Sequence, residues 1–208
     1  MSQVDIEVKT LKRRETHNNL RSTIVETVFF SDRKGWRKWL SENFDKKDEI
    51  WLILPKLSSS DKRIPYNDTV EEALCFGWID SIQRPYDEHH TIQRFSPRRK
   101  NSNWAQTNIE RLKRLDANGL LDPSVKESVK DLLQRKFVFP EDILTELKRD
   151  PIVWRNYQAF SEPYKRIRIA FIDGARDRPE EFNKRLHNFI EKTRQNKTFG
   201  YGGIEKYY

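Results

Sequence analysis

The chain has a single cysteine, Cys75, among its 208 residues. A disulfide within the chain is therefore excluded, and so are zinc ribbons and CxxC redox sites, which need two or more cysteines. Because Leu74 and Phe76 flank it, we expect Cys75 to be a buried and inert thiol on a helix. The alternative is a nucleophile activated by His89 or His90, the histidines nearest in sequence.

Long apolar runs are absent as well. The longest, such as 50–54, are far shorter than the roughly twenty residues of a membrane-spanning helix, so we expect no membrane insertion. Residues 1–22 mix acidic with basic side chains and lack the apolar stretch of a secretory signal. The cytoplasm is the expected location.

Hydrophobic residues are few, at 36%, and charged residues are many, at 35%. The chain nevertheless has 6 Trp, 12 Phe and 7 Tyr, which predicts a folded core rich in aromatic rings. A net charge of +8 favours anionic partners such as phosphorylated metabolites or nucleic acid. No cofactor motif is present, and the adjacent His89 and His90 would point to opposite sides of a strand, so we expect neither a cofactor nor a metal.

The N-terminal half predicts an α+β fold with a small mixed sheet in the order βαβαββα. Thr69 and Glu72 have the spacing of a capping box, which predicts a helix that ends at Gly77. The expected elements are strands at 27–30, 49–54, 79–84 and 91–95, and helices that carry Trp36 to Leu40, 70–76 and Trp104 to Leu115.

The second half predicts helices alone, separated by proline and glycine. We expect them at 121–133, 141–149, 152–160, 163–172 and 179–195. The predicted organisation is a flexible basic arm at 1–23, an α+β core at 24–119, a helical region packed on that core at 120–197 and a tail rich in glycine and tyrosine at 198–208.

Two stretches resemble the signature of the YdeI/OmpD-associated family, which is named for bacteriocin protection. They are EEALCFGWIDS at 71–81 and QRFSPRRKNSNW at 93–104. The resemblance is good over 29–119 and looser over 152–190. It implies a role in tolerance of bacteriocins or cationic peptides and an association with an outer-membrane porin, without an established reaction.

The densest group of chemically capable side chains lies on the predicted hairpin and just after it. Alternation along the strands would bring Asp80 within reach of Arg94, beside Trp78. Guanidinium groups suit phosphate or carboxylate ligands, and indole faces suit planar rings. The alternative is a buried Asp80–Arg94 pair that orients the hairpin, with the tryptophans in the core. The residues expected to bind an anionic ligand are Trp78, Asp80, Arg84, Arg94, Arg98 and Trp104.

Three functions remain open at this point. The first is a binding protein, without catalytic residues, for an anionic small molecule or a protein partner. The second is a nucleic-acid-binding regulator, because cations and amides of one loop can bind phosphate and the run 164–168 is also basic. The third is an enzyme with Asp80 as general acid or base. The residues of the second hypothesis are Arg98, Arg99, Lys100 and Asn101.

Overall fold

The computed structural model describes residues 7–12 and 24–200. It confirms the α+β fold, with a sheet and helices in the N-terminal half followed by helices. The described strands are β1 (Glu7–Lys12), β2 (Ile24–Phe29), β3 (Ile50–Pro55), β4 (Trp78–Pro85) and β5 (His90–Pro97). The described helices are α1 (Arg33–Asn43), α2 (Tyr66–Cys75), α3 (Gln106–Ala117), α4 (Pro123–Ser128), α5 (Lys130–Gln134), α6 (Glu141–Lys148), α7 (Pro151–Ala159), α8 (Glu162–Asp173) and α9 (Pro179–Arg194).

The chain forms two compact units. Unit 1 comprises the described residues up to Ser102 together with Leu115–Ser128. Unit 2 comprises Asn103–Arg114 and the described residues from Val129 onward. None of the described helices combines the length with the apolar composition that crossing a membrane requires.

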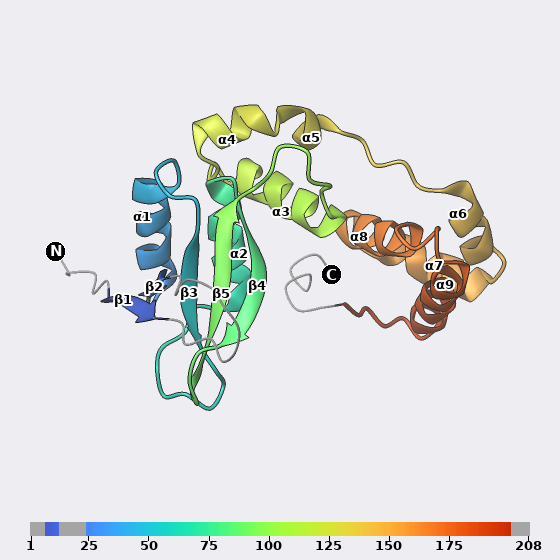
Figure 1. Ribbon diagram of the computed structural model, residues 1–208. Helices are drawn as coiled ribbons and strands as arrows, with labels where there is room; N and C mark the ends of the chain where they lie inside the picture. Colours follow the sequence, from blue (N-terminus) through green and yellow to red (C-terminus); the bar gives the residue numbers. More distant parts are fainter. Residues whose placement is uncertain (1–6, 13–23, 201–208) are drawn as a thin grey trace. The chain divides into compact units, whose positions relative to one another are not determined.

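The sheet of unit 1 has the strand order β1-β2-β3-β5-β4 (Figure 1). β2 and β3 are parallel, and helix α1 between them supplies the crossover connection that parallel neighbours need. The other pairs are antiparallel. The register between β4 and β5 shifts between residues 80 and 83.

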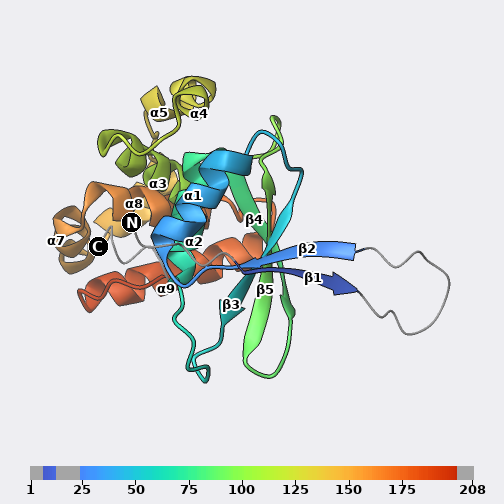
Figure 2. The same cartoon turned by 90° about the vertical axis from the view of Figure 1, so that its left-hand side faces the viewer.

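Helices α1 and α2 cover one face of the sheet (Figure 2). Beneath them lies an aromatic core in which Trp36 stacks on Trp39, with ring centres 5.5 Å apart, and meets Phe95 at 5.3 Å. Trp78 meets Trp39 edge to face at 6.1 Å. Each such pair adds ~0.5–1.5 kcal/mol of stability beyond the burial of its area. These ring contacts confirm the expected aromatic core.

Helix α2 begins at Tyr66, before the predicted capping box, and Thr69 and Glu72 lie inside it. The Thr69 hydroxyl donates to the carbonyl of Tyr66. The buried Glu72 carboxylate accepts hydrogen bonds from Arg33 and, at 2.6 Å, from Arg37, both on α1. The capping box is therefore wrong, because the side chain of Glu72 joins two helices instead of capping its own.

In unit 2, polar caps and prolines start the helices where the sequence predicts them. Asp150 accepts from the amide of Ile152 at 2.8 Å and begins α7, while Ser161 caps α8. The helix expected at 121–133 is instead two helices, α4 in unit 1 and α5 in unit 2. The buried core of unit 2 comprises Ile143, Leu147, Val153, Tyr157, Tyr164, Ile169, Ile172, Leu186 and Phe189.

The segment expected as a flexible arm contains a strand. β1 pairs with β2 in an antiparallel register that runs from Glu7 opposite Phe29 to Lys12 opposite Ile24. The N–H and C=O groups at the edge of a sheet can form hydrogen bonds with another strand whatever its side chains are. The polar composition of residues 7–12 therefore does not exclude a strand. The rest of the arm, and the expected tail from residue 201, lie outside the described residues.

Candidate functional site

The β4–β5 hairpin separates the two charged residues that were expected to meet. Asp80 lies opposite Phe95, on the face covered by helices, and accepts a hydrogen bond from the Tyr66 hydroxyl. Arg94 precedes Phe95, so its side chain leaves the opposite face of the sheet. There it binds the Glu49 carboxylate through Nε at 2.9 Å and Nη2 at 2.6 Å. The expected contact between Asp80 and Arg94 is therefore wrong.

Trp78 and Arg84 also lie on different faces. Trp78 is buried in the core, and its indole Nε1 donates to the carbonyl of Phe44 at 3.0 Å, as the alternative interpretation expected for this residue. The register shift between residues 80 and 83 reverses the alternation of β4. The guanidinium of Arg84 consequently lies 5.3 Å from the ring centre of Trp51, on the face away from α1 and α2.

The basic loop after β5 is partly tied to the fold. The amide of Arg98 donates to the carbonyl of Gly77 at 2.9 Å, and its Nη2 lies 3.4 Å from the carbonyl of Ser102. Trp104 belongs to unit 2, whereas the other five residues expected to bind the ligand belong to unit 1. Arg99, Lys100 and Asn101 of this loop are exposed.

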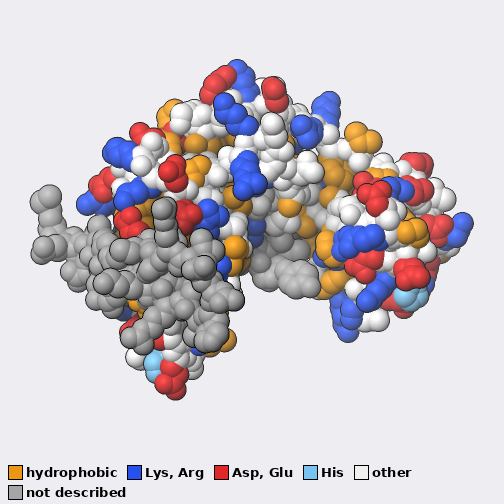
Figure 3. Space-filling view, viewed as in Figure 1, with side chains coloured by type: hydrophobic (Ala, Val, Ile, Leu, Met, Phe, Trp, Pro, Cys, Tyr) orange, Lys and Arg blue, Asp and Glu red, His pale blue; other side chains and the backbone are white. Residues whose placement is uncertain are grey.

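The basic run 164–168 offers less positive charge than the sequence suggests. Arg168 is buried, with 5% of its surface exposed. Arg166 binds both carboxylate oxygens of Glu110, at 2.7 and 2.8 Å. Acidic and basic side chains are interspersed over the C-terminal helices on the face drawn in Figure 3. Binding to nucleic acid remains a prediction, with weaker electrostatic support than the net charge gives.

Cys75 has the inert character expected of it. Burial raises the pKa of its thiol to about 11. The charged groups that also act on this thiol are Arg37, Glu72 and Arg33, not a histidine. A thiol with this pKa is almost entirely protonated near neutral pH and therefore a poor nucleophile.

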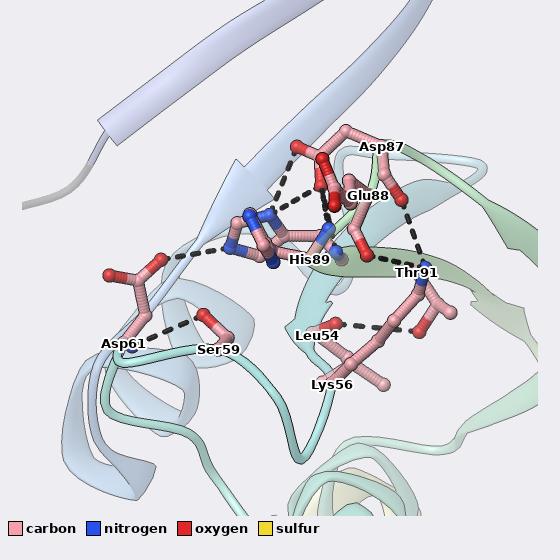
Figure 4. Close-up of polar contacts among 9 residues, drawn as sticks. Leu54, Lys56, Ser59, Asp61, Asp87, Glu88, His89 and Thr91 are labelled. Atoms are coloured by element: carbon pink, nitrogen blue, oxygen red, sulfur yellow. Dashed lines mark hydrogen bonds and ion pairs between the residues drawn. The ribbon is translucent and has the colours of Figure 1, made fainter.

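His90 begins β5 directly after the turn of the hairpin, and its imidazole lies between the carboxylates of Asp87 and Asp61, which Figure 4 labels. Its Nδ1 is 2.8 Å from Asp87 and its Nε2 is 2.8 Å from Asp61. Desolvation opposes the charged form, but the hydrogen bonds to Asp61 and Asp87 outweigh it and raise the pKa of His90. Because an imidazole donates from both nitrogens only when protonated, this contact favours the imidazolium ion.

A pocket of about 430 Å³ lies in unit 2. α8 and α9 supply most of its wall, each through residues three or four positions apart that share one side of a helix. The segment that follows α9 supplies the rest. The lining residues are Arg168 and Phe171 from α8, Glu181, Lys184, Arg185 and Asn188 from α9, and Phe199 and Gly200.

Arg168 is the buried cation of this pocket. Its guanidinium carbon lies 4.0 Å from the ring centre of Phe199 and 5.0 Å from that of Phe171. An aromatic ring attracts a cation through the face of the ring. The N–H groups of a guanidinium lie in the plane of the guanidinium, so a ring above that plane does not block their hydrogen bonds to a carboxylate or phosphate. Phe199 is held in place by the Tyr164 hydroxyl, which accepts from its amide at 3.1 Å and donates to its carbonyl at 3.3 Å.

Arg185 is fixed by three contacts at the same wall. Its guanidinium carbon lies 3.9 Å from the ring centre of Phe171, Nε donates to Glu181 at 2.6 Å, and Nη1 donates to the carbonyl of Phe171 at 2.7 Å. The hydrogen bond from Arg185 lowers the pKa of Glu181 and so keeps that carboxylate ionised. Lys184 is exposed and forms no ion pair with any residue in the described ranges.

Three cationic side chains and one carboxylate are therefore among the described residues that line the pocket. Arginine forks and a lysine ammonium bind carboxylate and phosphate groups, and the two phenyl rings supply an apolar wall. The arrangement suits an organic anion.

The sequence predicts no site at these residues. Arg168 falls in a basic run, and the spacings of Arg168 with Phe171 and of Glu181 with Arg185 and Asn188 lie within two separate predicted helices. Those spacings show that cations and an aromatic ring share helix faces. They do not show that the two faces meet, which depends on how α8 packs against α9.

The wall residues from 168 to 188 lie within a segment that matches a known family. Residues 136–196 match the family model described as Bacteriocin-protection, YdeI or OmpD-Associated. The match defines an OmpD-associated segment, which is the part of the chain that resembles this family. Phe199 and Gly200 lie beyond the OmpD-associated segment and also line the pocket.

The expected family is thus confirmed by the model of its C-terminal segment, where the resemblance was the looser one. A second model, described as a domain of unknown function (DUF8412), matches residues 28–128. The two stretches that suggested the OmpD-associated family lie in that part of the chain. Comparisons with curated proteins and with solved structures gave no match.

Proposed function

We propose that this protein binds a small organic anion and that the pocket lined by α8, α9 and the segment after α9 is the site. The observation that carries the proposal is that the Arg168 side chain of α8 is buried in a pocket that Lys184 and Arg185 also line. The rings of Phe171 and Phe199 lie against this guanidinium. An anion in the pocket would add a charged contact to it, and arginine and lysine side chains are the usual partners of carboxylate and phosphate groups.

The size of the pocket supports an organic ligand over an inorganic ion. Sites for small molecules have volumes of roughly 300–1,000 Å³, and this pocket is at the lower end of that range at about 430 Å³. Phosphate alone would leave most of the volume empty. Phe171, with 38% of its surface exposed, offers an apolar contact for the rest of the ligand.

We further propose that binding serves tolerance of bacteriocins, because the family's description names bacteriocin protection. A porin partner and a location in the cytoplasm are likewise proposals that rest on the family description and on the composition of the chain. The proposal concerns recognition, and it assigns no catalytic residue.

Calorimetric titration with phenyl phosphate tests the proposal, with Arg168→Met as the variant and Arg94→Met as the matched control in unit 1. Methionine keeps an unbranched apolar side chain and removes the charge. A lost hydrogen bond to a charged group costs ~1.5–3 kcal/mol, so Arg168→Met should weaken binding by roughly 10- to 100-fold. Arg94→Met should leave the affinity unchanged. No binding to the unmodified protein, or equal losses in both variants, would overturn the proposed site.

A further inference from the structure

A second, smaller pocket adjoins the proposed anion site. Its volume is about 190 Å³, and it shares two lining residues, Arg168 and Phe171, with the larger pocket. The described residues that line it all belong to unit 2. We propose that the ligand is an organic anion with an apolar extension about the size of one ring, and that this second pocket binds the extension. The inference rests on the proposed function and specifies its ligand.

The walls of the second pocket are mostly apolar. One wall comes from α8 and the other from the start of α3. The residues that it does not share with the larger pocket are Ile167 and Ala170 on α8, and Ala105, Gln106 and Thr107 at the start of α3. Isoleucine and alanine side chains contain only carbon and hydrogen, and the shared Phe171 adds a phenyl ring. These side chains offer more contact to an apolar group than to a polar one.

The volume of the second pocket sets the size of the extension. An apolar cavity of roughly 150 Å³ holds one benzene molecule, so a pocket of about 190 Å³ has room for one ring. Phe171 lines both pockets and has 38% of its surface exposed. A ligand that occupies both pockets can therefore lie against this ring.

The two walls of the second pocket are tied to each other by a buried carboxylate. The Glu110 side chain of α3 is 3% exposed and accepts hydrogen bonds from Arg166 of α8 at 2.7 and 2.8 Å. Gln106, one turn earlier on α3, donates to the same carboxylate at 2.7 Å. Because these contacts hold α3 against α8, binding of a ligand requires little further ordering of the walls.

Two phosphate monoesters test the inference in calorimetric titrations of the full-length protein. Phenyl phosphate has one ring, whereas 4-benzylphenyl phosphate has a second ring on a methylene group that lets it turn. The gain from burying a phenyl-sized group corresponds to about tenfold or more in affinity. The unmodified protein should therefore bind 4-benzylphenyl phosphate about tenfold more tightly than phenyl phosphate.

Ala170→Leu and Ala105→Leu fill the second pocket, each from a different wall. Neither alanine lines the larger pocket, so both variants should bind phenyl phosphate as the unmodified protein does. Both should reduce the preference for the second ring to less than about threefold, because the added side chain occupies its place.

Ala159→Leu on α7 is the matched control. It adds the same side-chain atoms to a helix of unit 2, at an exposed position that lines neither pocket. This variant should keep the full preference for 4-benzylphenyl phosphate. Circular dichroism of the four proteins checks that the helices are intact.

The outcomes distinguish the second pocket from the anion site. Equal affinity of the unmodified protein for the two esters would overturn the apolar extension and leave anion binding in place. A preference that persists in both Ala170→Leu and Ala105→Leu would show that the second ring binds elsewhere, which also overturns the inference. If neither ester binds, the proposed function itself fails.

Discussion

Replacement of Glu72 by glutamine should destabilise unit 1, because this buried carboxylate joins α1 to α2. Its side chain is 4% exposed and binds Arg33 and Arg37, whose side chains are 34% and 35% exposed. Glutamine fills the same volume but has no charge, and its amide group cannot accept from both arginines as a carboxylate does.

The size of the effect follows from what each arginine keeps. Arg33 retains Asp68 at 3.2 Å and Glu71 at 3.3 Å, and Arg37 retains the carbonyl of Leu120 at 2.8 Å. Removing one partner of a fully buried pair costs ~3–5 kcal/mol, but these arginines are partly solvated and keep other acceptors. We therefore expect a loss of ~2 kcal/mol in the free energy of unfolding.

Urea unfolding followed by tryptophan fluorescence measures this loss, since four of the 6 tryptophans, at positions 36, 39, 51 and 78, lie in unit 1. Glu42→Gln on α1 is the control. Glu42 is 53% exposed and lies 3.9 Å from Lys38, so its loss should cost less than ~0.5 kcal/mol. A change below ~0.5 kcal/mol for Glu72→Gln as well would refute the argument that this carboxylate stabilises the helix pair.

Three further perturbations have defined outcomes. Phe199→Ala removes the ring nearest to Arg168, which should weaken phenyl phosphate binding several-fold by leaving the cation less ordered; unchanged affinity in calorimetry would show that the ring does not organise the site. The raised pKa of His90 means that its ion pairs stabilise the fold below about pH 6.5 and that this stability is lost as the pH rises through the folded pKa. His90→Gln should remove that part of the pH dependence in urea unfolding, an effect below ~1 kcal/mol because the carboxylates are exposed, and an identical pH profile would contradict it. Cys75 should react with a disulfide reagent at least ~100-fold more slowly in the folded than in the unfolded protein; equal rates would show that the thiol is accessible.

The order of elements could be predicted from the sequence because each has a local signature. Apolar, β-branched runs mark β3, and prolines and polar caps mark α7 and α8. Such signals depend on neighbours within a few residues. They failed for Glu72, whose partners on α1 are 35 and 39 residues away.

The site could not be predicted because it depends on pairing and packing. Two features of the hairpin differ from the regular strand pairing that the sequence predicted: the register shifts after Asp80, and Glu49 lies beside Arg94. The sequence of the hairpin itself predicts neither feature. Arg168 presents the same difficulty, since one arginine in a basic helix has the same sequence context whether it is exposed or buried beneath Phe199.

Anion recognition is thus assigned to the helices of unit 2 and not, as the sequence predicted, to the hairpin of unit 1. The proposed ligand chemistry is unchanged from the sequence analysis, but the residues that carry it are different. Net charge predicted the sign of the partner, while only the structure shows which of the 40 lysines and arginines gather around a pocket.

A titration of the isotope-labelled full-length protein with phenyl phosphate, followed through its backbone amide NMR signals, tests this relocation most directly. The account predicts that the largest shifts fall on α8 around Arg168, on α9 between Glu181 and Asn188, and on Phe199. Shifts concentrated on residues 78–98 of the hairpin, with α8 and α9 unaffected, would contradict it.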